Sequence, residues 1–216
     1  MRFVTENRGR TLIKICGIRN REEVGYLIEN VVDFAGMVMF FPKSRRCIDE
    51  ETAAELVKVL GDGSDIKKTA VVVSPTAEQV RKIADIGFDY VQVHGELTEE
   101  VMENSPLPIL KAFNVSDLGE IERWNGCEKI AGYVFDAADY GSGKTFDWSL
   151  LENIDTKGRM FLLAGGLSPE NVIEAVKIVH PDGVDVSSGV EFDGGSGKDP
   201  KKIRDFCRFV RNADKW

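Results

Sequence analysis

A thiol and a carboxyl group each stand where an apolar segment of this chain ends. Cys16 follows the apolar residues 12–15 and precedes Gly17, and Asp136 directly follows the apolar residues 133–135. A short apolar run bounded by glycine is typical of a buried strand whose C-terminal end reaches the surface. In an α/β protein, chemistry is placed at such strand ends, so Cys16 is a candidate functional residue. Taken singly, a free cysteine is more often a packing residue and an aspartate more often caps a turn.

Basic side chains follow the second apolar run, which spans residues 34–40. Lys43, Arg45 and Arg46 lie in this segment, and arginine is the side chain suited to a bidentate grip on a carboxylate. The alternative is a solvated surface cluster, which is where most charged side chains lie. His94 ends another apolar run, and it is either an acid–base group or a hydrogen-bonded structural residue.

Two glycine-bearing segments follow the last two apolar runs of the chain, Gly165-Gly166 and Ser187-Ser188-Gly189. Glycine lets the backbone approach a ligand closely and exposes its N–H groups. Each segment by itself is better explained as a tight turn. The two together, on runs that are adjacent in the chain, favour a phosphate-binding site.

Apolar, β-branched runs alternate with stretches of helical spacing along the whole chain. The runs span residues 12–18, 34–40, 69–74, 90–94, 109–113, 130–136, 160–164 and 183–187, and helical spacing occurs at residues 22–29, 51–60, 77–86, 98–102, 169–179 and 200–210. Continuous rather than alternating hydrophobicity predicts parallel strands that are covered on both faces. Eight such units in 216 residues predict an α/β fold, a single (β/α)8 TIM barrel over residues 1–216, with residues 1–10 as a polar N-terminal extension. A doubly wound open sheet is the second choice, because no G-x-G-x-x-G motif opens the first helix.

The composition bears on partners and location. The formal net charge is −8, which disfavours a broad nucleic-acid surface. No stretch approaches about 18 consecutive apolar residues, and residues 1–10 lack the apolar core of a signal peptide. We therefore expect a cytoplasmic protein that binds neither nucleic acid nor membrane. Its four cysteines are expected to be free thiols.

Six motifs occur in order along the chain: KICGI at residues 14–18, FPKSRR at 41–46, VQVHGE at 91–96, GSGKTFDW at 141–148, AGGLSPENV at 164–172 and DVSSGVE at 185–191. Together they resemble the phosphoribosylanthranilate isomerase family over residues 14–206, nearly the whole chain. No single motif is decisive, but their ordered combination is highly specific.

The resemblance implies a (β/α)8 barrel enzyme that uses no metal and no cofactor. Its reaction is the Amadori rearrangement of N-(5-phosphoribosyl)anthranilate to 1-(o-carboxyphenylamino)-1-deoxyribulose 5-phosphate in tryptophan biosynthesis. The partner it implies is therefore a small phosphorylated molecule, and the oligomeric state, monomer or homodimer, stays open.

The resemblance also implies a role for individual residues. The catalytic base falls on Cys16 and the catalytic acid on Asp136, with Asp139 kept as an alternative acid because the loop after Asp136 is short. Arg46 is expected to contact the anthranilate carboxylate, and the two glycine-bearing segments are expected to bind the phosphate. The predicted substrate-binding residues are Arg46, Gly165, Gly166, Asp185, Ser187, Ser188 and Gly189.

The implied mechanism needs protonation states that are the reverse of those that the ordinary pKa values of its two catalytic groups give. The reference values are roughly 8.5 for cysteine and 3.9 for aspartate, so a thiolate beside a carboxylic acid costs on the order of 6 kcal/mol. Desolvation could raise the pKa of the acid, and Lys14, Arg46 or backbone N–H groups could favour the thiolate. Two other functions are weighed against the isomerase: a different phosphosugar enzyme on the same barrel, and a barrel that binds a ligand without turnover.

Overall fold

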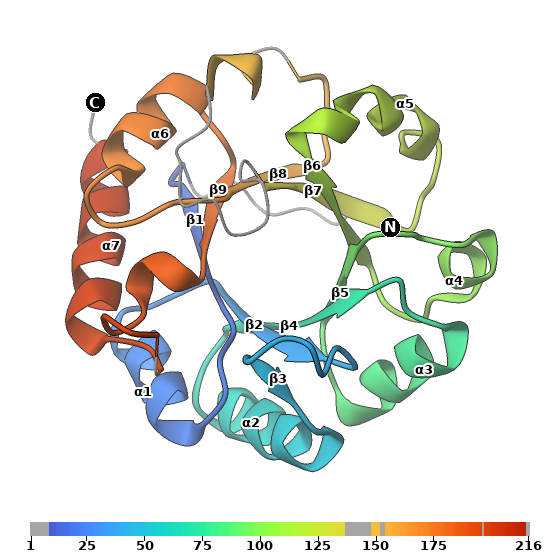
Figure 1. Ribbon diagram of the computed structural model, residues 1–216, viewed down its shortest axis with the longest axis horizontal. Coiled ribbons are helices and arrows are strands. Elements are labelled where there is room, and N and C mark those ends of the chain that lie inside the picture. Colours follow the sequence, from blue (N-terminus) through green and yellow to red (C-terminus); the bar gives the residue numbers. More distant parts are fainter. Residues whose placement is uncertain (1–8, 137–147, 152–153, 196, 215–216) are drawn as a thin grey trace.

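The computed structural model describes residues 9–136, 148–151, 154–195 and 197–214. Parallel strands form a ring at the centre of the molecule, and helices surround it (Figure 1). The ring closes because β1 pairs with both β9 and β2. The described strands are β1 Leu12–Cys16, β2 Phe34–Met39, β3 Cys47–Ile48, β4 Lys67–Val73, β5 Tyr90–His94, β6 Ile109–Asn114, β7 Ile130–Asp136, β8 Met160–Ala164 and β9 Gly183–Val186.

The helices lie outside the ring and follow the strands in the chain (Figure 1). Several begin at a capping side chain: Asp49 accepts from the N–H of Thr52, and Thr76 and Gln79 form a reciprocal capping box. The described helices are α1 Arg21–Glu29, α2 Glu50–Gly63, α3 Ala77–Ile86, α4 Glu99–Asn104, α5 Ile121–Trp124, α6 Val172–Val179 and α7 Pro200–Ala213, with 3₁₀ turns η1 Val115–Glu120, η2 Trp148–Leu151 and η3 Ser188–Val190. None of the helices in the described part of the chain has the length and apolarity needed to cross a membrane.

The buried apolar side chains form two separate cores. The larger lies between the strands and the helices, and the smaller includes Leu110, Ala112, Val134 and Leu162 from three neighbouring strands. Since successive side chains of a strand point to opposite faces, the smaller set fills the barrel interior. Polar residues interrupt this interior: Lys14, Thr69, Gln92 and Asp185 are all buried on the strands.

The predicted (β/α)8 barrel is confirmed, and three predicted strands have the observed bounds: 90–94, 130–136 and 160–164. The helix predicted over 169–179 is wrong at its start, because α6 begins at Val172. A turn comes first, in which the Asn171 side chain accepts from the N–H of Ser168 and donates to the carbonyl of Gly166. The two-residue strand β3, which pairs with the end of β2, is not predicted by the sequence.

Candidate active site

The parallel strands bring the predicted catalytic residues to one rim of the barrel. Cys16 ends β1 and Asp136 ends β7, and β9 and β8 lie between these two strands in the ring. Asp136 is partly buried, and Asp139 lies outside the described residues. The thiol and the acid thus stand at the same end of the barrel on well-separated strands, where this fold builds its active sites.

The thiol of Cys16 lies above a buried ion pair. The Nζ of Lys14 donates to Oδ2 of Asp185 at 2.7 Å, and the two side chains are 0% and 6% exposed. Burial raises the pKa of the Cys16 thiol, and Asp185 adds to this rise, whereas the charges of Lys14 and Lys198 oppose it. Burial works against the charge of Lys14, but Asp185 and Cys16 outweigh it and raise the pKa of this lysine, which stays an ammonium group.

Arg46 is held by a carboxylate of the same chain. Its Nε donates to Oε1 of Glu191 at 2.6 Å and a terminal nitrogen donates to Oε2 at 3.1 Å. Arg45 and Lys198 bind the same carboxylate, at 2.6 Å and 3.3 Å. Burial alone would raise the pKa of Glu191, but the Arg46 hydrogen bond and the charges of the three cations outweigh it and lower the pKa. Two donors of Arg46 serve this pair, out of the five that a guanidinium group carries.

The loops that carry the two glycine-bearing segments are in contact with one another. Gly165 and Gly166 have φ angles of +82° and +64°, in the left-handed region that favours glycine. A Cβ on Gly189 would overlap the carbonyl oxygen of Leu167, so only glycine permits this approach of the loop after β9 to the loop after β8. The Oγ of Ser187 donates to the carbonyl of Cys16 at 3.0 Å, which joins the same loop to the end of β1.

His94 ends β5 as a neutral imidazole. Burial, and then the charges of Lys14 and Lys111, lower its pKa to about 4. Its Nε2 lies 2.9 Å from Nε2 of Gln92, two residues earlier on the same face of the strand. At neutral pH this side chain carries no charge, so it can donate or accept a hydrogen bond at the rim but does not attract an anion.

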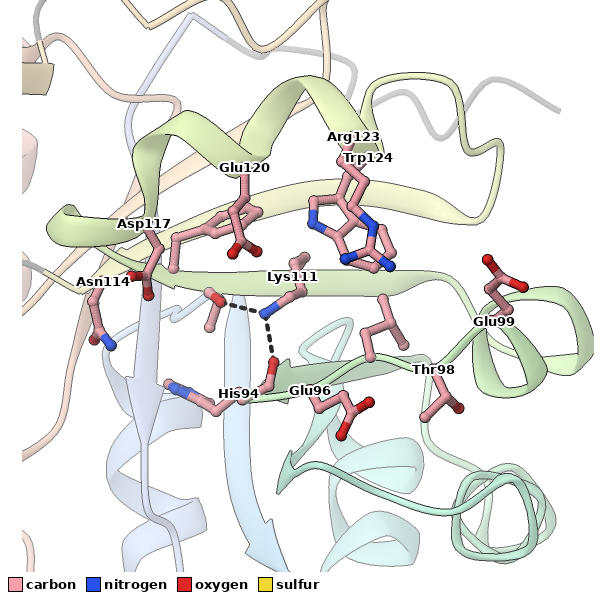
Figure 2. Close-up of a pocket in the computed structure, with 14 residues that line it drawn as sticks. His94, Glu96, Thr98, Glu99, Lys111, Asn114, Asp117, Glu120, Arg123 and Trp124 are labelled. Carbon is pink, nitrogen blue, oxygen red and sulfur yellow. Dashed lines mark hydrogen bonds between the residues drawn. The ribbon is translucent and has the colours of Figure 1, made fainter.

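A hollow of about 730 Å³ opens at the ends of β5 and β6, with Lys111 at its centre (Figure 2). The Nζ of Lys111 donates to the carbonyls of Gly95 and Ala112, so its charge is already hydrogen-bonded by the backbone. Four carboxylates line the hollow: Glu96, Glu99, Asp117 and Glu120. Because acids repel a phosphorylated ligand, the basic side of the rim at β1, β2 and β9 is the better anion site.

Comparison with known proteins identifies the family. The family model described as N-(5'phosphoribosyl)anthranilate (PRA) isomerase matches residues 13–208. The chain belongs to this family. The N-(5'-phosphoribosyl)anthranilate isomerase of Aquifex aeolicus is 38% identical over 203 residues, which cover 93% of this chain and 98% of that relative. The enzyme of the same name from Streptococcus pneumoniae R6 is 40% identical over 207 residues, or 94% and 97% of the two chains.

Solved structures of phosphoribosylanthranilate isomerases share the fold. The Thermotoga maritima enzyme superimposes with a TM-score of 0.81 at 35% identity, covering 94% of this chain and 99% of its own. A phosphoribosylanthranilate isomerase in complex with reduced 1-(o-carboxyphenylamino)-1-deoxyribulose 5-phosphate has a TM-score of 0.79 at 33% identity, with the same coverage. The resemblance drawn from the six motifs is thereby confirmed, whereas the roles of individual residues stay predictions.

Three residues around the site are not among those predicted from the sequence: Gly36, Glu191 and Lys198. Glu191 is the last residue of the DVSSGVE motif, but the motif does not indicate its contact with Arg46. Lys198 follows a glycine-containing segment and has no pattern of its own. Gly36 lies inside an apolar run, where an isolated glycine indicates a close approach of other groups.

Proposed function

We propose that this chain isomerises N-(5'-phosphoribosyl)anthranilate to 1-(o-carboxyphenylamino)-1-deoxyribulose 5-phosphate in tryptophan biosynthesis. The observation that carries the proposal is family membership over residues 13–208, together with a barrel rim that offers a thiol, an acid and a basic cluster. A relative of the same fold was solved with the reduced form of this product. The enzyme is thus an isomerase that works on a small phosphorylated substrate.

General acid–base catalysis accounts for the reaction. Asp136, when protonated, donates to the ribose ring oxygen, and the ring opens to a protonated imine. Cys16, as thiolate, then removes the proton from C2, and the enolamine that results tautomerises to the ketone. The separation of β1 and β7 by two strands supports this division, since the base and the acid then reach the substrate from different sides.

Substrate binding is assigned to the basic side of the rim. Arg46 would grip the anthranilate carboxylate with donors outside its pair with Glu191. Gly189 approaches Leu167, in the loop that carries Gly165 and Gly166, and this contact supports a joint phosphate cradle built from Gly165, Gly166, Ser187, Ser188 and Gly189. Asp185 has one buried oxygen, Oδ1, with no hydrogen-bond partner among the described residues, and this oxygen would accept from a substrate hydroxyl group.

Oligomeric state and location stay predictions. The Thermotoga maritima relative is described as dimeric in a structure of monomers derived from it, which supports testing for a homodimer here. Light scattering on the purified chain measures this directly. A cytoplasmic location is proposed because the reaction belongs to amino-acid biosynthesis.

The deciding experiment is a fluorescence assay that follows the loss of freshly made phosphoribosylanthranilate. We expect turnover by the unmodified chain, and a fall of orders of magnitude in kcat for Cys16→Ala and for Asp136→Asn, while both variants still bind a product analogue. Asp139→Asn is the matched control. Near-normal turnover in Asp136→Asn, with loss in Asp139→Asn, would move the acid to Asp139. No turnover by well-folded unmodified protein would overturn the proposal.

A further inference from the structure

A buried lysine lies directly beneath the Cys16 thiol in the barrel interior. Lys14 and Cys16 are two residues apart on β1, so their side chains point to the same face of the strand. The neighbouring strand leaves room for both, because Cys16 pairs with Gly36 on β2. A Cβ built on Gly36 would lie 3.0 Å from the Sγ of Cys16 and 3.0 Å from the Nζ of Lys14. The absent side chain therefore lets the sulfur and the ammonium group share one small space.

Asp185 fixes the lysine from β9, the neighbour of β1 on the side away from β2. Lys14 and Asp185 are register partners on β1 and β9, and their 2.7 Å hydrogen bond is shielded from solvent. A lysine buried without an acid tends to lose its proton, whereas one paired with a carboxylate keeps it. Asp185 thus has two effects on Lys14: it keeps the side chain cationic, and it holds the Nζ atom just below the sulfur of Cys16.

The charges that face Cys16 come from several elements. Lys14 on β1 and Lys198, which precedes α7, favour the thiolate, whereas burial and Asp185 on β9 oppose it. Arg46 packs against Gly17, the residue after the thiol, and its charge is bound by Glu191. A thiolate in this space needs a nearby cation, because an uncompensated buried charge is strongly disfavoured.

We propose that Lys14, anchored by Asp185, is a positioning residue that stabilises the thiolate form of Cys16. The inference rests on the proposed role of Cys16 as the base, and it adds the group that makes a partly buried thiolate possible. Lys14 touches neither the substrate nor the transferred proton. It acts only through the sulfur.

Ionisation of Cys16 tests the proposal without any need for turnover. The ultraviolet absorbance of the thiolate is measured as a function of pH in the unmodified chain. The curve of Cys16→Ala is then subtracted, and this subtraction removes the contribution of the other three cysteines. Lys14→Met should raise the midpoint by at least about one pH unit, a tenfold loss of thiolate at a given pH below it. Asp185→Asn removes the carboxylate that keeps Lys14 cationic, and a neutral amide lets the buried lysine lose its proton, so the midpoint should rise here as well. A purely structural role of the ion pair would leave the midpoint of a folded variant unchanged.

A double variant keeps the test decisive if Lys14→Met fails to fold with an unpaired buried carboxylate. Lys14→Met combined with Asp185→Asn removes both charges, and the midpoint should still exceed that of the unmodified chain, because Lys14 acts on the thiol more strongly than Asp185. A midpoint equal to or below the unmodified value in a folded variant would overturn the proposal. Full turnover in Cys16→Ala would instead overturn the role of Cys16, and the ionisation result would stand by itself.

Discussion

The carboxylate of Glu191 offers a direct comparison between distance and burial as determinants of ion-pair strength. Arg45 lies 2.6 Å from Glu191 but its side chain is 55% exposed, whereas Lys198 lies at 3.3 Å and is 1% exposed. With an effective dielectric constant of about 20, charges 3.3 Å apart attract by about 5 kcal/mol before desolvation is subtracted. In water a pair 2.6 Å apart gains only about 1.6 kcal/mol. Burial should therefore outweigh distance.

Double-mutant cycles in urea unfolding measure these couplings. We expect about 1.5–3 kcal/mol between Glu191 and Lys198, as for a buried hydrogen bond to a charged group. Between Glu191 and Arg45 we expect less than about 1 kcal/mol, as for an exposed pair. The variants are Glu191→Gln, Lys198→Met and Arg45→Met, with the two double combinations. An Arg45 coupling equal to or larger than that of Lys198 would refute the reasoning.

Two further predictions concern the rim. Gly189→Ala should separate the loops after β8 and β9 and lower the free energy of unfolding by roughly 1–3 kcal/mol. It should also weaken the binding of inorganic phosphate, which calorimetry measures. Gly25→Ala is the matched control, because its new Cβ meets nothing within 4 Å, and it should leave the stability unchanged or increase it. Unchanged phosphate binding in Gly189→Ala would contradict the joint cradle. Because the pKa of His94 is about 4 in the folded chain and near 6.5 when unfolded, the unfolded chain binds the extra proton between these values. The free energy of unfolding should thus decrease as the pH falls from about 6.5 to about 4. Urea unfolding at several pH values measures this dependence, and it should be weaker in His94→Asn. An equal pH dependence in the variant would exclude His94 as its source.

The sequence predicts the barrel well because its information is local. Continuous apolar runs, capping residues and glycines mark the strands and turns at the positions where they act. Contacts between distant segments carry no such mark. Glu191 binds Arg46, which lies 145 positions earlier in the chain, and the sequence around each residue does not indicate that the two are in contact. The sequence predicts the start of α6 too early for a local reason. The Asn171 side chain supports a turn, and the helix-start signal at residues 168–170 does not distinguish this turn from a helix.

The proposed mechanism needs a thiolate at Cys16 beside a protonated Asp136, the reverse of their ordinary pKa values. The barrel interior shows how much of the answer to this problem can be predicted from the sequence. Lys14 and Cys16 share a face of β1, and Asp185 and Ser187 are spaced in the same way at the end of β9, so period-two spacing alone places a cation under the thiol once the strands are known. What the spacing cannot give is the register that joins Lys14 to Asp185. Asp136 ends β7, with β8 and β9 between it and β1. We propose Cys16 as the base and Asp136 as the acid, and two strands separate them in the ring, so the surroundings of one group can shift its pKa without shifting that of the other in the same direction.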